Sequence, residues 1–368
     1  MRILGTNFFG HDSALCLLDT RRREVVAEST ERSTRICNDW IDVGPTLRAA
    51  GIRDLDAACH GYHTLNSQDD EITTPLSLRN LELQKLARAV LRPRYEADLN
   101  LSRLRKAGRL AAAFGRSPGA VLRYLRERVL YAARRERPVA AEEMLRYMGK
   151  TLAFAGASCA SVSLHDHHLC HAASAYYFSP FAFREKALVL SLDGAGDGHF
   201  SKLHLFDGPT WTLLGASRSP LLRRHGEATF VSIGAIYSGF TAALAHYGVE
   251  NEGGLSALAA YGSPDDGLYR ALRDCIAVSA QGFAFDLSRA KTFFDDAALA
   301  ARALRLGERN FAATVQRWLE DVVVEHLAAA HALHGTDNLC LAGGVAANIV
   351  MNMRIFERTP FRAIHVFP

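Results

Sequence analysis

Hydrophobic and polar residues alternate in two separate stretches of the chain, and both stretches predict the same succession of strands. The first series predicts strands at Arg2–Phe8, Ala14–Leu18 and Glu24–Glu28, with a turn at residues 10–13. The second series predicts strands at Ala187–Leu192, Lys202–Phe206 and Trp211–Ala216, with a turn at residues 193–198. Each series runs strand, turn rich in glycine or aspartate, strand, strand. We therefore expect a weak internal duplication of two α/β lobes.

Helical periodicity follows the second series, at residues 229–248 and 308–334. A short apolar run, Asn338–Leu341, then predicts a buried strand that leads into Gly343-Gly344 and a further helix. Strands that alternate with helices in this way are typical of an α/β fold.

Residues 79–150 differ from the rest in composition, because they contain 18 Lys and Arg but only 7 Asp and Glu. Leucine and valine recur there at helical spacing, so we expect a helical, Arg-rich insertion. We expect a first lobe at 1–78 and 151–186 and a second lobe at 187–368. The basic segment is either a surface for an anionic partner, such as RNA or a phosphorylated substrate, or simply a solvated helical face. We favour the second interpretation and expect no nucleic-acid partner.

Composition limits the class of protein. Of 368 residues, 49% are hydrophobic and 22% charged, which supports a large core and about two domains. The seven cysteines are irregularly spaced, which is typical of reduced thiols in a cytoplasmic protein. The N-terminal sequence lacks the pattern of a signal peptide, and no apolar run is long enough to span a membrane. We therefore expect a cytoplasmic protein without a membrane partner.

A histidine cluster, His-Asp-His-His-Leu-Cys-His at residues 165–171, precedes an alanine-rich run that favours helix. His167 and His171 are four residues apart, so on a helix both imidazoles project from one face. This spacing is typical of a metal-binding pair, and the first turn of a helix favours neutral, ligating imidazoles. A structural cluster without a ligand is the alternative. The zinc-protease pattern is not met, because His168 occupies the position of its glutamate.

Two glycine-rich turns are candidates for binding phosphate or nucleotide. Glycine lets backbone N–H groups approach phosphate oxygens, as could occur at residues 193–198 and at Gly343-Gly344. Asp193 and Asp197 would repel a phosphate, so they suit a bridging cation or a substrate hydroxyl. Either turn could also be a plain connection between elements.

Five motifs occur in a fixed order along nearly the whole chain: Gly10–Ala14, His167–Ala175, Asp193–Asp197, Glu252–Gly253 with Leu258–Gly262, and Leu341–Asn348. This set resembles the O-carbamoyltransferases of nodulation-factor and antibiotic biosynthesis (the NodU/CmcH type). These enzymes are relatives of the threonylcarbamoyl-transfer protein of tRNA modification. The resemblance implies a duplicated fold of the actin, sugar-kinase and Hsp70 type, with ribonuclease H-like lobes.

The resemblance also implies a function and a site. A carbamoyl group would pass from ATP-derived carbamoyl-adenylate to a hydroxyl of a small natural-product acceptor. His11 and Asp12 would be catalytic, and His167 and His171 would hold a divalent metal, Fe2+ in the family. The implied nucleotide-binding residues are Asp193, Gly194, Gly196, Asp197, Gly198, Gly343, Gly344 and Asn348.

Members of the family continue beyond the strand expected at 361–368. There they supply an aspartate to the metal, a closing helix and a YrdC-like domain that makes carbamoyl-adenylate. We therefore expect the second lobe to be incomplete at its C-terminal end and the chain alone to be inactive without a YrdC-like domain or subunit. A homodimer is a further candidate assembly. Two alternatives stay open: a tRNA-modification relative, suggested by the basic segment, and a non-catalytic nucleotide-binding remnant. The second is suggested by Asn251 and Gly254, where the family has Asp and Lys.

Overall fold

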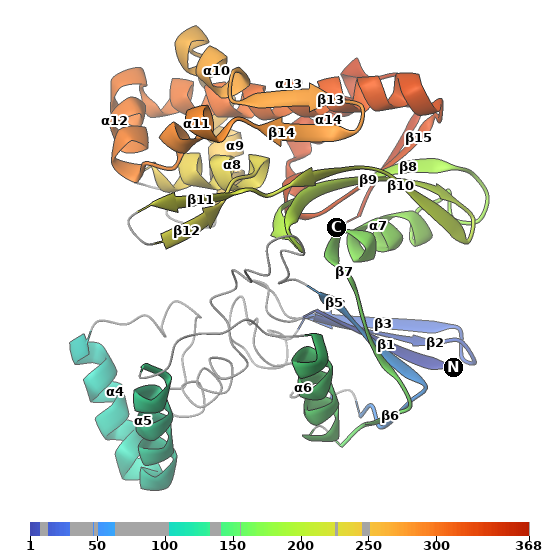
Figure 1. Ribbon diagram of the computed structural model, residues 1–368, viewed down its shortest axis with the longest axis vertical. Coiled ribbons are helices and arrows are strands. Elements are labelled where there is room, and N and C mark those ends of the chain that lie inside the picture. The colour runs from blue at the N-terminus through green and yellow to red at the C-terminus, as the bar shows by residue number, and fades with distance from the viewer. Residues whose placement is uncertain are drawn as a thin grey trace. The chain divides into compact units, whose positions relative to one another are not determined.

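The chain forms two compact units, residues 1–166 and residues 167–368 (Figure 1). The computed structural model describes residues 1–7, 14–29, 47, 51–62, 103–132, 141–154, 156–224, 227–244 and 251–367.

The first unit is built around one sheet with a helix on its buried face. Its described elements are β1 (Arg2–Asn7), β2 (Ala14–Asp19), β3 (Glu24–Ser29), β4 (Asp54–Leu55), β5 (Ala57–Tyr62), α4 (Arg103–Arg116), α5 (Pro118–Ala132), α6 (Ala141–Phe154), β6 (Ser158–Cys159) and β7 (Val162–Asp166). The strand order is β3-β2-β1-β5-β7, in which β1 to β3 are antiparallel and β5 and β7 continue in parallel. Alternation along β1 and β2 buries Leu4 and Leu15 in a core that also contains Met148 and Leu152 of α6.

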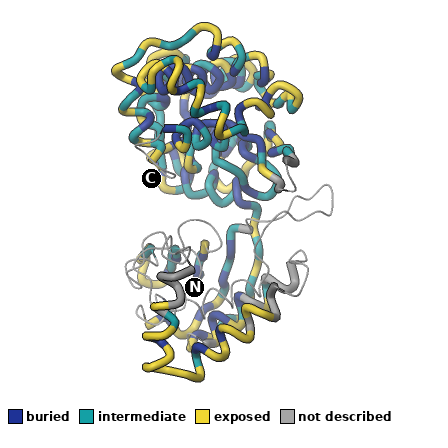
Figure 2. Tube along the Cα trace, turned by 90° about the vertical axis from the view of Figure 1, so that its left-hand side faces the viewer, coloured by how far each residue is buried: buried dark blue, intermediate teal, exposed yellow. Residues whose placement is uncertain are grey.

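The second unit has a larger core, whose buried residues gather at its centre in Figure 2. Its long central helix buries Phe311, Trp318 and Leu327 completely. The described elements of this unit are α7 (His167–Tyr177), β8 (Ala187–Gly196), β9 (His199–Asp207), β10 (Thr210–Arg218), β11 (Leu221–Arg224), β12 (Glu227–Phe230), α8 (Ile233–Ala242), α9 (Glu252–Ala259), α10 (Asp266–Arg273), β13 (Ile276–Ser279), β14 (Gly282–Phe285), α11 (Leu287–Ala290), the 3-10 turn η2 (Lys291–Phe293), α12 (Asp296–Leu306), α13 (Glu308–His334), β15 (Asn338–Ala342), the 3-10 turn η3 (Gly344–Ala347), α14 (Ile349–Arg358) and β16 (Ala363–Val366).

The two units repeat one sheet topology. The second sheet has the order β10-β9-β8-β15-β16, with β8 to β10 antiparallel and β15 and β16 parallel to β8. Equivalent positions even carry equivalent ion pairs. Arg2 Nε lies 3.1 Å from Asp19 Oδ2 in the first sheet, and Lys186 Nζ lies 3.1 Å from Asp207 Oδ2 in the second. This repetition confirms the duplicated α/β lobes of the actin and sugar-kinase type.

Most of the expected elements are present, and the differences have local causes. The strand expected at 187–192 continues to Gly196, because β8 still pairs with β9 at the Gly196–His199 step. The helix expected from residue 229 begins only at Ile233. Residues 227–230 pair with β11 as β12, and the hydroxyl of Ser232 caps α8 by accepting the N–H of Ala235 at 2.9 Å.

The described part of the basic 79–150 segment is helical and consists of α4, α5 and α6; residues 79–102 and 133–140 lie outside the described residues. The helix α7 packs against β8 and β15, so it belongs to the second unit, although the expected first lobe extended to residue 186. Among the described residues, no helix is both long and apolar enough to cross a membrane.

Candidate metal centre

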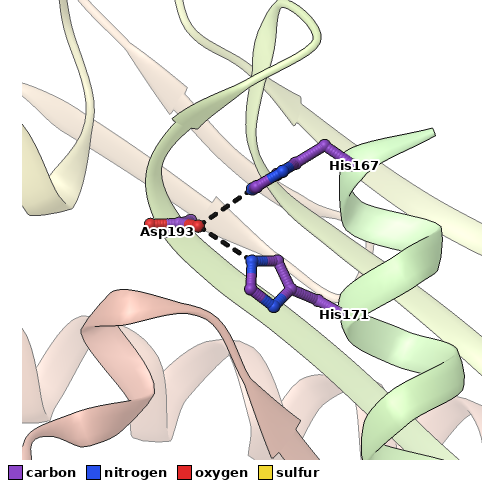
Figure 3. Close-up of side chains that lie close together, drawn as sticks. All are labelled: His167, His171 and Asp193. Atoms are coloured by element: carbon purple, nitrogen blue, oxygen red, sulfur yellow. Dashed lines mark hydrogen bonds and ion pairs between the residues drawn. The ribbon is translucent and has the colours of Figure 1, made fainter. Parts of the chain in front are cut away.

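Two histidines at the start of α7 form the base of the site. The chain leaves β7 at Asp166 and enters α7 at His167, so His167 is the first residue of the helix and His171 follows one turn later. His167 and His171 lie one turn apart on the same side of α7, with their ring centroids 4.5 Å apart (Figure 3). The helical spacing expected of a metal-binding pair is therefore present.

Asp193 of β8 completes a cluster of three donors. Its Oδ2 atom lies 3.0 Å from Nε2 of His167 and 3.1 Å from Nε2 of His171 (Figure 3). One ligand atom from each residue lies within 4.8 Å of the other two. From the sequence, Asp193 is expected in the glycine-rich turn as a residue suited to a bridging cation. The third metal ligand is expected beyond residue 368, whereas the structure places Asp193 within reach of both histidines.

The two imidazoles stabilise the ionised form of Asp193. Burial alone would raise the pKa of Asp193, but hydrogen bonds from His167 and His171 outweigh it and hold the pKa well below its usual value. The side chain of His167 is 9% exposed and that of His171 is 31% exposed, so the cluster is open on the His171 side. A ligand could therefore approach without displacing His167.

The donor set fits a divalent first-row metal ion. Two imidazole nitrogens and one carboxylate oxygen are the protein ligands of mononuclear Fe2+ sites, and the same types of ligand bind Zn2+. Three protein ligands also leave coordination positions for a substrate or water. The residues of this cluster are therefore compatible with the metal that the family resemblance implies.

The turn after β8 is shaped to hold His167. A Cβ atom on Gly196 would lie 2.1 Å from Cδ2 of the His167 ring, so only glycine leaves room for the imidazole. The next residue, Asp197, has a positive φ of 49° and accepts the backbone N–H of His167 at 2.7 Å through Oδ2. Gly198 follows with φ +74°. These residues support the cluster by packing and hydrogen bonding, and their contact with a nucleotide stays a prediction.

His168 points away from the cluster into the protein. Its ring is completely buried. Burial is the main cause that lowers the pKa of His168 to about 3, and the charge of the neighbouring His167 lowers it further. The ring is therefore neutral. Since its Nε2 lies 3.0 Å from the carbonyl oxygen of His199, which can only accept, Nε2 carries the proton. Nδ1 then accepts the hydroxyl proton of Ser191 at 2.8 Å.

The second glycine-rich turn lies directly beside Asp193. A Cβ on Gly343, whose φ is +93°, would lie 2.4 Å from the carbonyl oxygen of Leu192. A Cβ on Gly344 would lie 3.1 Å from Oδ1 of Asp193. In contrast, a Cβ on Gly194 would meet nothing within 4 Å. The structure thus brings the two turns expected at the nucleotide together at the end of β8, with open space at Gly194.

Asn348 is half-buried and is held by a hydrogen-bonded network. Its Oδ1 accepts the N–H of Met351 at 2.9 Å and caps α14. Its amide also pairs reciprocally with that of Gln316 at 2.9 and 3.1 Å, and its Nδ2 donates to the hydroxyl of Tyr237 at 3.3 Å. Gln316 and Tyr237 are not predicted from the sequence, because neither lies in a recognisable motif. A contact between Asn348 and a nucleotide stays a prediction.

The remaining predicted residues, His11 and Asp12, lie outside the described residues. The departure at Asn251 has a simple local role, since its Oδ1 caps α9 by accepting the N–H of Gly254 at 3.1 Å. Asparagine and aspartate are equally good at this position of a helix. Its neighbour Glu252 accepts the hydroxyl of Ser238 at 2.6 Å.

Comparison with known proteins identifies relatives of the chain. Residues 132–368 match the family described as carbamoyltransferase N-terminus. An uncharacterised protein of Methanocaldococcus jannaschii is 33% identical over 382 residues, covering all of this chain and 60% of that protein. The nodulation protein NolNO of Sinorhizobium fredii is 29% identical over 232 residues, covering 56% of this chain and 29% of that protein. The chain thus spans less than two thirds of the length of these relatives.

Solved structures align with the chain at low sequence identity and low TM-scores. A ROK family protein from Streptococcus pneumoniae aligns with all of this chain and 92% of its own, at 11% identity and a TM-score of 0.36. The Ppx/GppA phosphatase of Aquifex aeolicus aligns with 96% of this chain and 99% of its own, at 11% identity and a TM-score of 0.25. The fold assignment therefore rests on the strand order of the two sheets.

Proposed function

This chain belongs to the carbamoyltransferase family, and we propose that it transfers a carbamoyl group from carbamoyl-adenylate to a hydroxyl group of a small acceptor. The observation that carries the proposal is the convergence of His167, His171 and Asp193 on one point. That cluster lies beside two glycine-rich turns, which is where a phosphate group and a metal would need to meet.

We propose that His167, His171 and Asp193 hold a divalent metal ion, with Fe2+ as the first candidate. The ionised Asp193 offsets part of the ion's charge, and the neutral imidazoles supply two nitrogen donors. When bound there, a divalent ion supplies positive charge that stabilises the negative charge developing on a leaving phosphate. The more exposed His171 side leaves room for that phosphate to approach.

The turns at the end of β8 would orient the nucleotide. An anion can approach the backbone at Gly194 and Gly344 closely, because no Cβ atom intervenes, although the N–H of Gly194 itself donates to Oδ1 of Asp193. In the transfer step the acceptor O–H bond breaks, a new bond forms from that oxygen to the carbamoyl carbon, and the bond from this carbon to the phosphate oxygen breaks. AMP leaves, and the proton passes to a general base.

We propose His11 or Asp12 as that base, on the strength of the family resemblance. Carbamoyl-adenylate would come from a YrdC-like domain or subunit that uses carbamoyl phosphate and ATP. The acceptor would be a small hydroxylated natural product.

The proposal is tested by the double variant His167→Ala/His171→Ala. We expect it to lose bound metal and to lose carbamoyl transfer when carbamoyl-adenylate and a panel of hydroxylated acceptors are supplied. His165→Ala is the matched control, because His165 precedes α7 in β7 and bonds to Ser163 instead of Asp193. A double variant that is purified with full metal occupancy would refute the ligand assignment. A metal-replete wild-type chain that transfers nothing, even with a YrdC-like partner, would refute the reaction.

A further inference from the structure

A series of hydrogen bonds links the elements that carry the candidate metal centre and does not use the metal-binding atoms. His168 is its central member, since the ring bonds to two different strands. One ring nitrogen accepts the hydroxyl of Ser191, two residues before Asp193 on β8, and the other donates to the carbonyl of His199 at the start of β9. The ring thereby ties the first turn of α7 to both strands that flank the site.

The series of hydrogen bonds leads back to α7 through the turn between β8 and β9. Nδ1 of His199 lies 2.9 Å from the carbonyl oxygen of Asp197, and Oδ2 of Asp197 accepts the N–H of His167 at 2.7 Å. The bond to Ser191 fixes α7 directly to the strand that carries Asp193, and the other bonds fix α7 to the turn and strand that follow it. Because ligand distances in metal sites lie within about 0.2 Å of standard values, such fixing bears directly on metal binding.

We propose that His168 is a positioning residue, which with Ser191 and the His199 carbonyl holds His167 and His171 at metal-binding distance from Asp193. This inference rests on the proposed function, because it assigns a second layer of residues to the proposed metal site. It also explains why two adjacent histidines begin α7: His167 faces the site, and His168 anchors it.

The experiment compares His168→Phe with His326→Phe. Phenylalanine keeps a ring in each place but removes the hydrogen bonds. His326 is an equally buried histidine that bonds to the carbonyl of Ser279 at 2.6 Å, away from the site on α13. Each protein is stripped of metal and titrated with Co2+, and its absorption spectrum and melting temperature are recorded. We expect His168→Phe to weaken Co2+ binding about 10- to 100-fold and to change the spectrum. We expect His326→Phe to bind Co2+ like the wild type, even if it melts at an equally reduced temperature.

A second readout needs no metal. In the metal-free protein, the backbone N–H of His167 should exchange with deuterium more than tenfold faster in His168→Phe than in the wild type, because its partner Asp197 is no longer held. Ser191→Ala should change both readouts in the same direction by a smaller factor, and it decides the matter if His168→Phe does not fold. Wild-type Co2+ affinity together with unchanged exchange at His167 would overturn the proposal. If the wild type binds no metal, the proposed metal site fails, and the exchange readout alone decides whether His168 positions α7.

Discussion

Replacing Gly196 by alanine should damage the metal centre without touching a ligand atom. The added methyl group would lie 2.1 Å from Cδ2 of His167, whereas ordinary contacts begin at 3.4 Å, so the ring or the turn must move by about 1.3 Å. Metal sites tolerate ligand displacements of roughly 0.2 Å, so the shift is several times too large. Gly194→Ala is the matched control, because the same methyl group two residues earlier meets nothing within 4 Å.

The assay is a Co2+ or Zn2+ titration of the metal-free proteins, followed by calorimetry and by the Co2+ absorption spectrum. We expect Gly196→Ala to bind the ion about 10- to 100-fold more weakly than the wild type. Forcing a methyl group into a packed site should also reduce the free energy of unfolding by about 1–3 kcal/mol. Gly194→Ala should keep the wild-type affinity and stability.

Two results would contradict this reasoning. If Gly196→Ala bound metal like the wild type, His167 could not be a ligand in the position that the structure gives it. If Gly194→Ala lost as much affinity as Gly196→Ala, the effect would come from stiffening the turn and not from the contact with His167.

Three further predictions concern other parts of the chain. Burial raises the pKa of Asp321, but hydrogen bonds from Tyr269 and Arg358 outweigh this effect and lower the pKa. Asp321→Asn weakens these bonds, so it should reduce the free energy of unfolding by about 1–3 kcal/mol at pH 7. A lowered pKa stabilises the fold above the unfolded value of about 3.9, so the difference from the wild type should shrink as the pH falls below about 4. Urea unfolding at pH 7 and pH 3 measures this, and a constant difference would contradict it. Asn348→Ala removes the cap of α14 and the amide pair, so it should reduce the free energy of unfolding by about 1–3 kcal/mol, and a thermal melt with no change would exclude that structural role. His11→Ala should reduce turnover while sparing nucleotide binding, and a loss of nucleotide affinity with normal turnover at saturation would exclude His11 as the base.

Much of the fold could be predicted from the sequence, because the features involved are local. The mainly apolar sequence of β2, the partial alternation in β1 and the continuous apolar run of β8 indicate where these strands lie. The repetition of strand, turn, strand, strand was sufficient to predict the duplication. The start of α8 was placed too early, because the pairing of β11 with β12 competes with helix there and depends on a partner outside the window.

Within the candidate site, too, the residues on one helix could be predicted from the sequence, and those brought together by packing could not. The pair His167 and His171 could be found because both lie on one helix, where spacing alone determines proximity. Asp193 could not be assigned to them, since it is 22 residues after His171 on a different element and meets it only through the packing of α7 on β8. The same holds for Gly196, whose need for glycine comes from the His167 ring and not from its own turn.

The metal content of the purified wild-type protein, together with its X-ray absorption fine structure, decides whether His167, His171 and Asp193 bind a metal ion. We expect about one divalent ion per chain, bound by two imidazole nitrogens and at least one carboxylate oxygen. In Asp193→Asn we expect the oxygen ligands of the ion to change. An ion bound without imidazole ligands, or a protein that binds no divalent ion after reconstitution under reducing conditions, would contradict this assignment.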